Sequence, residues 1–220
     1  MLAKAAGRQL YKIWQCAKIA QIEHAIFINF GSLLGCVRDK TFIKHDNDTD
    51  VCVRADWITE DQEQQFHKSL KAVGLFEYRN REMRRPDTGR LLWLSLKSEL
   101  KDGVKSCVWM MFPHNGYMFH SKGDLWLTKI GGKKRIRDAI GKYRIEDFQA
   151  VCKGNSIRCF DKLVPAKFCG TDVQIPCLYG TLLDEMYPNW AVPVFGCSSD
   201  EYLLMAIRKW SEPKTWIAIP

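Results

Sequence analysis

Hydrophobic residues recur at helical spacing at the start of the chain. Within residues 3–24 the apolar positions fall close to the 3.6-residue period of a helix; they are Leu10, Ile13, Trp14, Ala17 and Ala20. Ile19 and Ile22 lie outside this stripe. Because the segment is rich in alanine and has no proline, we predict an amphipathic helix that packs on a sheet.

The next apolar runs are typical of strands. Residues 26–30 form a short apolar run that suits a buried strand, and Gly-Ser at 31–32 ends it before a short helix. Residues 49–54 alternate between polar and apolar side chains, which predicts a strand with one buried face. The segment 59–62, Thr-Glu-Asp-Gln, carries a capping signal for a helix that continues to about residue 73.

The second half of the chain carries weaker signals. We predict strands at 76–81, 91–96, 105–112, 117–120 and 152–160, a basic loop or hairpin at 131–144, an extended connection at 163–176, and helices at 177–186 and 200–209. The sequence has no internal repeat, low-complexity segment or clear linker. The chain is therefore predicted to form one α+β domain that spans residues 1–220, with a mixed sheet flanked by helices.

The composition is that of an ordinary globular protein with a basic balance. Hydrophobic residues make up 46% of the 220 residues, and 33 Lys and Arg oppose 25 Asp and Glu, for a net charge of +8. Such a charge suits an anionic partner, although it also serves solubility alone. Charge therefore does not choose among nucleotides, phospho-sugars, nucleic acid and membrane surfaces.

The nine cysteines are scattered along the chain without a repeated spacing. Most are expected to be buried small residues in a reducing compartment. Cys152, Cys159, Cys169 and Cys177 could together bind zinc, but no Cys-x-x-Cys pair supports that interpretation. The first 25 residues lack an apolar run long enough for a membrane span or signal peptide. We expect a cytoplasmic or membrane-peripheral protein, unless an anchor lies outside this chain.

The candidate chemistry lies in one stretch, residues 31–53. Asp46, Asp48 and Asp50 occupy alternate positions that lead into the predicted strand. Residues two apart on a strand point to one side, so Asp48 and Asp50 would face the same way. Two carboxylates that close are best tolerated around a divalent cation, and Mg²⁺ takes oxygen ligands of this kind. This pattern indicates a metal-dependent phosphoryl or nucleotidyl transferase.

The beginning of the same stretch suits phosphate binding. Gly31 lets the backbone approach a phosphate, and a helix that starts there presents free N–H groups. Ser32 adds a hydroxyl donor, Arg38 a guanidinium and Lys44 a further positive charge. Each part alone has a plainer interpretation, such as a turn for Gly-Ser or a solvated loop for the acids. A calcium loop is disfavoured because its glycine and its twelfth-position glutamate are missing.

The stretch GSLLGCVRDKTFIKHDNDTDVCV resembles the signature of the LicD/fukutin family, a branch of the polymerase-β-like nucleotidyltransferase superfamily. The matching positions are Gly31, Ser32, Leu33, Leu34, Gly35, Arg38, Ile43, Asp46, Asp48 and Asp50. Later segments are also similar to this family, at 112–116, 163–165, 173–176, 179–183 and 187–193. The resemblance covers about residues 20–195, with a strong motif early and weaker ones late.

This resemblance implies the transfer of a phosphorylated alcohol, such as phosphocholine or ribitol phosphate, from a CDP-activated donor to a glycan or glycolipid. It implies that Asp48 and Asp50 hold Mg²⁺ or Mn²⁺ with Asp46 close by, and that the residues of the glycine-rich segment hold the donor's phosphates. A membrane-surface contact, or the Golgi lumen if an anchor lies elsewhere, would fit such an acceptor. No nucleic acid partner is expected.

One position departs from the family pattern. The further Asp expected on the strand before Pro113 is replaced by Cys107 or Met110, depending on the alignment. The sequence leaves open a replacement by Asp102 or Asp124, a one-metal enzyme, or a degenerate nucleotide-binding domain. A nucleotidyltransferase that uses an NTP is the other enzymatic alternative, since it shares the Gly-Ser and Asp pair.

Overall fold

The computed structural model describes residues 2–44, 46–77, 82–84, 91–93, 95–98, 103–114, 117–120, 126–129, 132–135, 150–152, 155–187, 189–193 and 217–219. The helices are α1 (Leu2–Ile19), α2 (Phe30–Leu34), α3 (Glu60–Ala72) and α4 (Tyr179–Met186). The strands are β1 (Ile26–Ile28), β2 (Asp48–Arg54), β3 (Leu75–Glu77), β4 (Glu82–Arg84), β5 (Leu91–Trp93), β6 (Ser95–Ser98), β7 (Lys105–His114), β8 (Tyr117–His120), β9 (Trp126–Lys129), β10 (Gly132–Arg135), β11 (Ala150–Cys152), β12 (Asn155–Ser156), β13 (Leu163–Phe168), β14 (Thr171–Pro176) and β15 (Ile217–Ile219).

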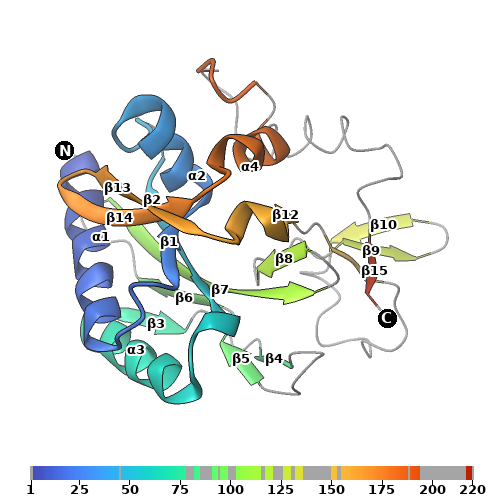
Figure 1. Cartoon of the computed structure of the whole chain (residues 1–220), viewed down its shortest axis with the longest axis horizontal. Coiled ribbons are helices and arrows are strands. Elements are labelled where there is room, and N and C mark those ends of the chain that lie inside the picture. The colour runs from blue at the N-terminus through green and yellow to red at the C-terminus, as the bar shows by residue number, and fades with distance from the viewer. Residues whose placement is uncertain are drawn as a thin grey trace.

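The main sheet is mixed and is built around β2 and β7 (Figure 1). Its strand order is β1-β2-β7-β6-β3, while β8 pairs with the later part of β7 and β12 pairs with β8. β2 and β7 run parallel, and the other pairs in this sheet are antiparallel. The fold is therefore α+β with a mixed sheet flanked by helices, as the sequence predicts.

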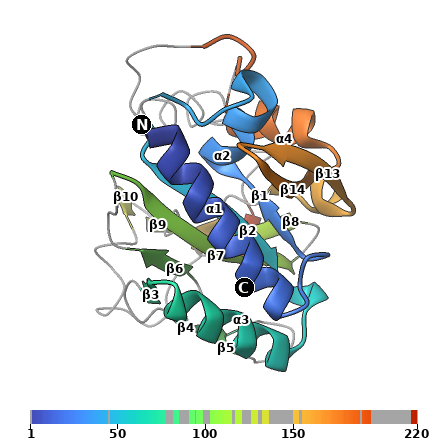
Figure 2. The same cartoon turned by 90° about the vertical axis from the view of Figure 1, so that its left-hand side faces the viewer.

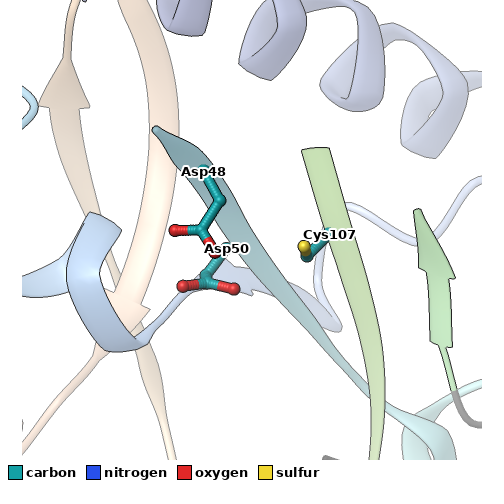
Figure 3. A group of neighbouring side chains, drawn as sticks. All are labelled: Asp48, Asp50 and Cys107. Atoms are coloured by element: carbon teal, nitrogen blue, oxygen red, sulfur yellow. The ribbon is translucent and has the colours of Figure 1, made fainter. Parts of the chain in front are cut away.

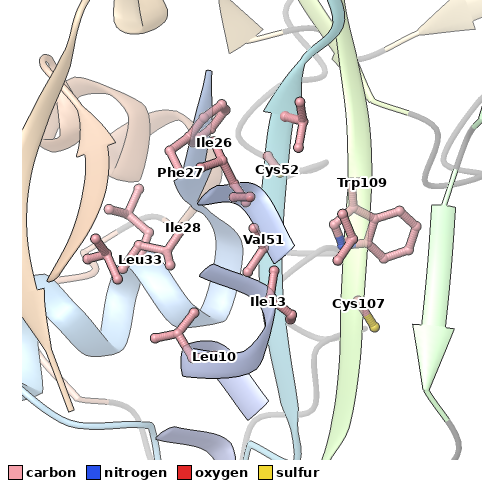
Figure 4. Close-up of a cluster of buried hydrophobic side chains, with 14 of the residues drawn as sticks. Leu10, Ile13, Ile26, Phe27, Ile28, Leu33, Val51, Cys52, Cys107 and Trp109 are labelled. Carbon is pink, nitrogen blue, oxygen red and sulfur yellow. The ribbon is translucent and has the colours of Figure 1, made fainter. Parts of the chain in front are cut away.

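Helix α1 lies across the main sheet and contacts β2, β7 and α3 (Figure 2). Leu10 and Ile13 are fully buried, as the helical stripe predicts, whereas Ile19 is 60% exposed. Figure 4 shows the side chains of α1 beside Val51 of β2, within the apolar core. The hydrophobic effect of this burial holds the helix on the sheet.

Local signals predict the ends of the next elements well. Thr59 caps α3 with a complete capping box: its hydroxyl accepts the Gln62 N–H, and the Gln62 side chain accepts the Thr59 N–H. Gly74 follows the helix with φ +90°, a conformation that glycine adopts without strain. The strand expected at 26–30 is shorter, because Phe30 already begins α2.

Other expectations need correction in the second half. The strand predicted at 152–160 is only β12 and the end of β11, since residues 157–160 form a 3-10 turn. The connection predicted at 163–176 is the β13–β14 hairpin, with Cys169 and Gly170 at its tip in left-handed conformations. The basic stretch predicted as a loop or hairpin contains β10, which pairs with β9. The helix predicted at 200–209 lies outside the described residues.

Smaller strand pairs complete the architecture. β4 pairs with β5, and β9, β10, β11 and β15 form a second sheet. In the part of the chain that the structure describes, no helix combines the length and apolar character that a membrane crossing requires.

Candidate active site

Asp48, Asp50 and Cys107 converge at the start of the parallel strand pair (Figure 3). The strand register places Cys107 of β7 directly beside Asp50 of β2. One ligand atom from each residue lies within 4.8 Å of the others, and within the described residues this is the group that could hold a metal ion. The predicted acid pair is therefore formed as expected, with a thiol as its third member.

The strand alternation also resolves which residue takes the place of the missing acid. Met110 pairs with Val53 and so lies on the opposite face of the sheet from Asp50. Cys107 shares the face of the acids and is 1% exposed. Cys107, and not Met110, thus occupies the position beside the acid pair. Asp102 and Asp124 lie outside the described residues.

Hydrogen bonds hold both the side chain and the backbone N–H of Asp50. The indole Nε1–H of Trp109 donates to Asp50 Oδ1 at 2.9 Å, and the Asp50 backbone N–H donates to Ser32 Oγ at 2.9 Å. Asp50 and Trp109 are each 3% exposed, and Ser32 is fully buried. A buried carboxylate needs such donors because water no longer solvates it. Ser32 therefore fixes the backbone at Asp50, and Trp109 fixes its side chain.

Asp46 lies against both Asp48 and the glycine-rich segment. Its Oδ1 accepts the Asp48 N–H at 3.4 Å. Burial, a hydrogen bond between the Asp46 and Asp48 carboxyl groups, and the charges of Asp48 and Asp50 raise the pKa of Asp46 to about 8. The three acids are thus close enough that they do not all ionise easily without a cation.

The glycines of the motif are required by close approach. A Cβ on Gly31 would overlap Asp46 Oδ2, so only glycine leaves room for this carboxylate. A Cβ on Gly35 would lie 2.6 Å from the backbone oxygen of Thr41. Because neither glycine has a side chain, the segment at 41–46 can pack against the glycine-rich segment. This packing brings Asp46 close to the other acids.

The backbone between β1 and α2 is strained beside the acids. Phe30 has φ +51°, a left-handed conformation that is unfavourable for an aromatic residue. The preceding Asn29 donates its N–H to Asp50 O at 3.3 Å and is fully buried, and its Oδ1 has no hydrogen-bond partner. Strain and an unsatisfied buried polar atom are typical of functional sites.

The two predicted cations lie in different settings. Arg38 donates to both carboxylate oxygens of Asp39 at 2.7 Å, and its Nη1 lies 3.5 Å from the backbone oxygen of Trp190. Arg38 thus joins the central motif to the late segment that also resembles the family. Lys44 is exposed. His45, beside it in the sequence, lies outside the described residues.

The zinc interpretation of the later cysteines gains no support from the described side chains. Cys159, Cys169 and Cys177 do not form a ligand group there, and the side chain of Cys152 is not described. Burial, together with nearby Glu185 and Cys177, raises the pKa of the Cys159 thiol to about 12.

With this geometry in place, the comparison with protein families is decisive. The family model LicD/FKTN/FKRP, nucleotidyltransferase domain, matches residues 23–139, more than half of the chain. The chain belongs to the LicD family. The match includes Gly31, Asp46, Asp48, Asp50 and Cys107, so the converging residues lie within the LicD domain.

The other comparisons add less. Among solved structures, the chain is similar to the crystal structure of ANT(2″)-Ia in complex with adenylyl-2″-tobramycin, with 11% identity and a TM-score of 0.42. The alignment covers 95% of this chain and 91% of that one. No curated protein sequence matches the chain significantly.

Three residues of the site were not expected from the sequence. Nothing in the local sequence of Trp109 indicates a bond to an acid that lies 59 residues away. Asn29 lies within the apolar run at 26–30 and has no separate signal. Asp39 follows Arg38 directly, and that adjacency is the one signal that could have indicated their pairing.

Proposed function

We propose that this LicD-family protein is a divalent-cation-dependent transferase that moves a phospho-alcohol from a CDP-activated donor to a hydroxyl of a glycan or glycolipid. The observation that carries the proposal is the convergence of Asp48 and Asp50 on one face of the parallel pair, in a chain whose family is a nucleotidyltransferase domain. Phosphoryl transfer depends mainly on positioning and charge neutralisation, which such a pair supports.

The donor set fits a divalent cation. Asp48 and Asp50 offer oxygen ligands of the kind that Mg²⁺ and Mn²⁺ accept, and the Trp109 N–H holds the Asp50 carboxylate through Oδ1. A bound cation would neutralise charge on the donor's phosphoryl oxygens. Asp46 would stay beside Asp48, in the space that Gly31 leaves for it.

The remaining residues would position the donor. We assign Gly31, Ser32, Arg38 and Lys44 to the donor's phosphates, of which Ser32 also holds β2 at Asp50. The acceptor hydroxyl oxygen would form a bond to the alcohol-side phosphorus, and the bond from that phosphorus to the bridging oxygen would break. CMP would leave with the bridging oxygen, and the hydroxyl proton would pass to solvent.

The decisive experiment measures CMP release from CDP-choline or CDP-ribitol, in the presence of Mg²⁺ or Mn²⁺ and a glycan acceptor. We expect Asp48→Asn and Asp50→Asn each to lower kcat by about a thousandfold, equivalent to about 4 kcal/mol. The amide keeps the shape of the carboxylate and an oxygen that can accept the Trp109 N–H, so the fold should persist. Release of pyrophosphate from an NTP would instead favour the nucleotidyltransferase alternative.

A matched control is available on the surface. Asp172 on the β13–β14 hairpin is 86% exposed and pairs only loosely with Lys167, at 3.8 Å. Asp172→Asn should leave CMP release unchanged. Full activity in folded Asp50→Asn protein would disprove the proposed cation site.

A further inference from the structure

Cys107 occupies a position where the chemistry of the site calls for a ligand. It lies beside Asp50 in the strand register, on the face that carries Asp48 and Asp50, and it is 1% exposed. Its sulfur lies within 4.8 Å of a carboxylate oxygen from each acid. The position of this sulfur therefore follows from the parallel pairing of β2 and β7.

The distances suit a shared cation. Zinc binds carboxylate oxygen at about 2.0–2.2 Å and thiolate sulfur at about 2.3 Å. In tetrahedral coordination, two such donors of one zinc ion therefore lie about 3.3–3.7 Å apart. A set whose atoms lie within 4.8 Å of one another can close on such an ion when side-chain rotations bring the donors about 1 Å nearer to one another.

The nature of the third donor changes which cation fits best. A thiolate carries the same charge as a carboxylate, so the total charge of the ligand set matches that of three acids. Sulfur is a soft donor, however, and favours zinc-like cations, whereas Mg²⁺ takes oxygen ligands almost exclusively. Coordination would release the thiol proton to solvent, since the thiolate is the ligand form.

Cys52 shows that burial alone does not create this arrangement. It lies on the next position of the same face of β2, is fully buried, and pairs in register with Trp109. Cys52 is nevertheless not part of the ligand group, whereas Cys107 is. The two cysteines have similar burial, and they differ in whether the sulfur meets the acids.

We propose that Asp48, Asp50 and Cys107 form a mixed carboxylate–thiolate centre that binds zinc-like divalent cations in preference to Mg²⁺. The inference rests on the proposed function, since it specifies the cation of the same site. It replaces the sequence-based expectation of Mg²⁺ with a selectivity that follows from the sulfur.

The test uses Cd²⁺ as a spectroscopic probe for zinc, because cadmium–thiolate bonds absorb in the ultraviolet. The full-length protein is titrated with Cd²⁺ and then challenged with Mg²⁺. We expect a charge-transfer band that Cys107→Ser removes, and a drop in Cd²⁺ affinity of about tenfold or more in that variant. Asp50→Asn should weaken the same component of the band, because it removes a ligand charge and leaves every cysteine in place.

Cys52→Ala is the matched control, and it should retain the Cys107-dependent band. The difference spectrum between wild type and Cys107→Ser excludes absorbance from the other cysteines. Cys107→Asp, an all-oxygen set, should bind Mg²⁺ more tightly than wild type does. If that variant fails to fold, the wild-type and Cys107→Ser titrations still decide the question.

A wild-type band equal to that of Cys107→Ser would overturn the proposal, as would displacement of Cd²⁺ by equimolar Mg²⁺. Parallel assays of CMP release separate this failure from that of the proposed function. Transfer supported by Mg²⁺ without a Cys107-dependent band rejects the mixed centre and leaves the transferase intact. A Cys107-dependent band without CMP release under any tested cation supports the centre and rejects the transferase.

Discussion

The two faces of the β2–β7 pair differ in whether they carry carboxylates, although both contribute buried side chains to the core and their residues alternate along the same strands. One face carries Val51, Val53, Val108 and Met110, all buried in the apolar core. The other face carries the acids with Cys107 and Trp109. Burial of the apolar face stabilises the fold, whereas burial of neighbouring carboxylates costs stability. Substitutions on the face without carboxylates should therefore affect stability more than catalysis.

Packing on the face without carboxylates can be weakened without a change in the face that carries the acids. Ile13 of α1 is fully buried in the core that includes Val51. Ile13→Ala should lower the free energy of unfolding by about 2–5 kcal/mol, because it removes buried methyl groups and leaves a cavity. Denaturant unfolding measures this loss. Activity per folded molecule should remain at the wild-type level, and a parallel collapse of kcat in folded protein would contradict the separation of the faces.

Conversely, the arrangement of the acids can be disturbed with little change in the stability of the fold. Gly31→Ala places a methyl group where Asp46 Oδ2 lies, so the carboxylate must move away from Asp48. We expect kcat/KM for the donor to fall by about a hundredfold, equivalent to about 2.7 kcal/mol. The matched control is Gly180→Ala in α4, where an added Cβ meets nothing within 4 Å. That variant should keep full activity and a melting temperature at or above that of wild type.

Trp109 tests the hydrogen bond that links the two strands at the acids. Trp109→Phe keeps an aromatic ring but removes the Nε1–H that donates to Asp50 Oδ1. We expect the apparent cation affinity to fall by about tenfold, or about 1.4 kcal/mol, because Asp50 is less firmly held. Calorimetric titration with Mn²⁺ measures this change. Trp57→Phe is the control. The guanidinium carbon of Arg54 lies 4.2 Å from the centroid of the Trp57 ring, so Trp57 contacts Arg54 and not the acids. This variant should leave the cation affinity unchanged.

Local sequence signals correctly predicted the elements whose formation depends on interactions between neighbouring residues. The apolar stripe of α1, the Thr59 cap and the glycine after α3 all act within one or two helical turns, and the structure confirms them. The hairpin at 163–176 was interpreted as an extended connection. Its turn uses Cys169 at φ +49° before Gly170, and a cysteine gives no sequence signal for a left-handed turn.

The candidate site was only partly predictable, because some of its contacts join residues that lie far apart in the sequence. Alternation along one strand was enough to place Asp48 and Asp50 on one side. Arg38 is predicted to contact the donor's phosphates, and the structure adds that it bonds to the neighbouring Asp39 and reaches Trp190. The sequence offers several partners to a long cationic side chain, and only the packing of the late segment shows which of them lie within reach.

By itself, the sequence determined the α+β class, the family motif and the paired acids, because helical period, strand alternation and motif spacing are properties of neighbouring residues. The tertiary structure alone decided that Cys107 rather than Met110 meets Asp50, and that Trp109 holds its carboxylate. Those facts depend on the register of β2 against β7, which are separated by more than fifty residues. A register shift of one residue would exchange the two faces of β7, and only long-range packing excludes it.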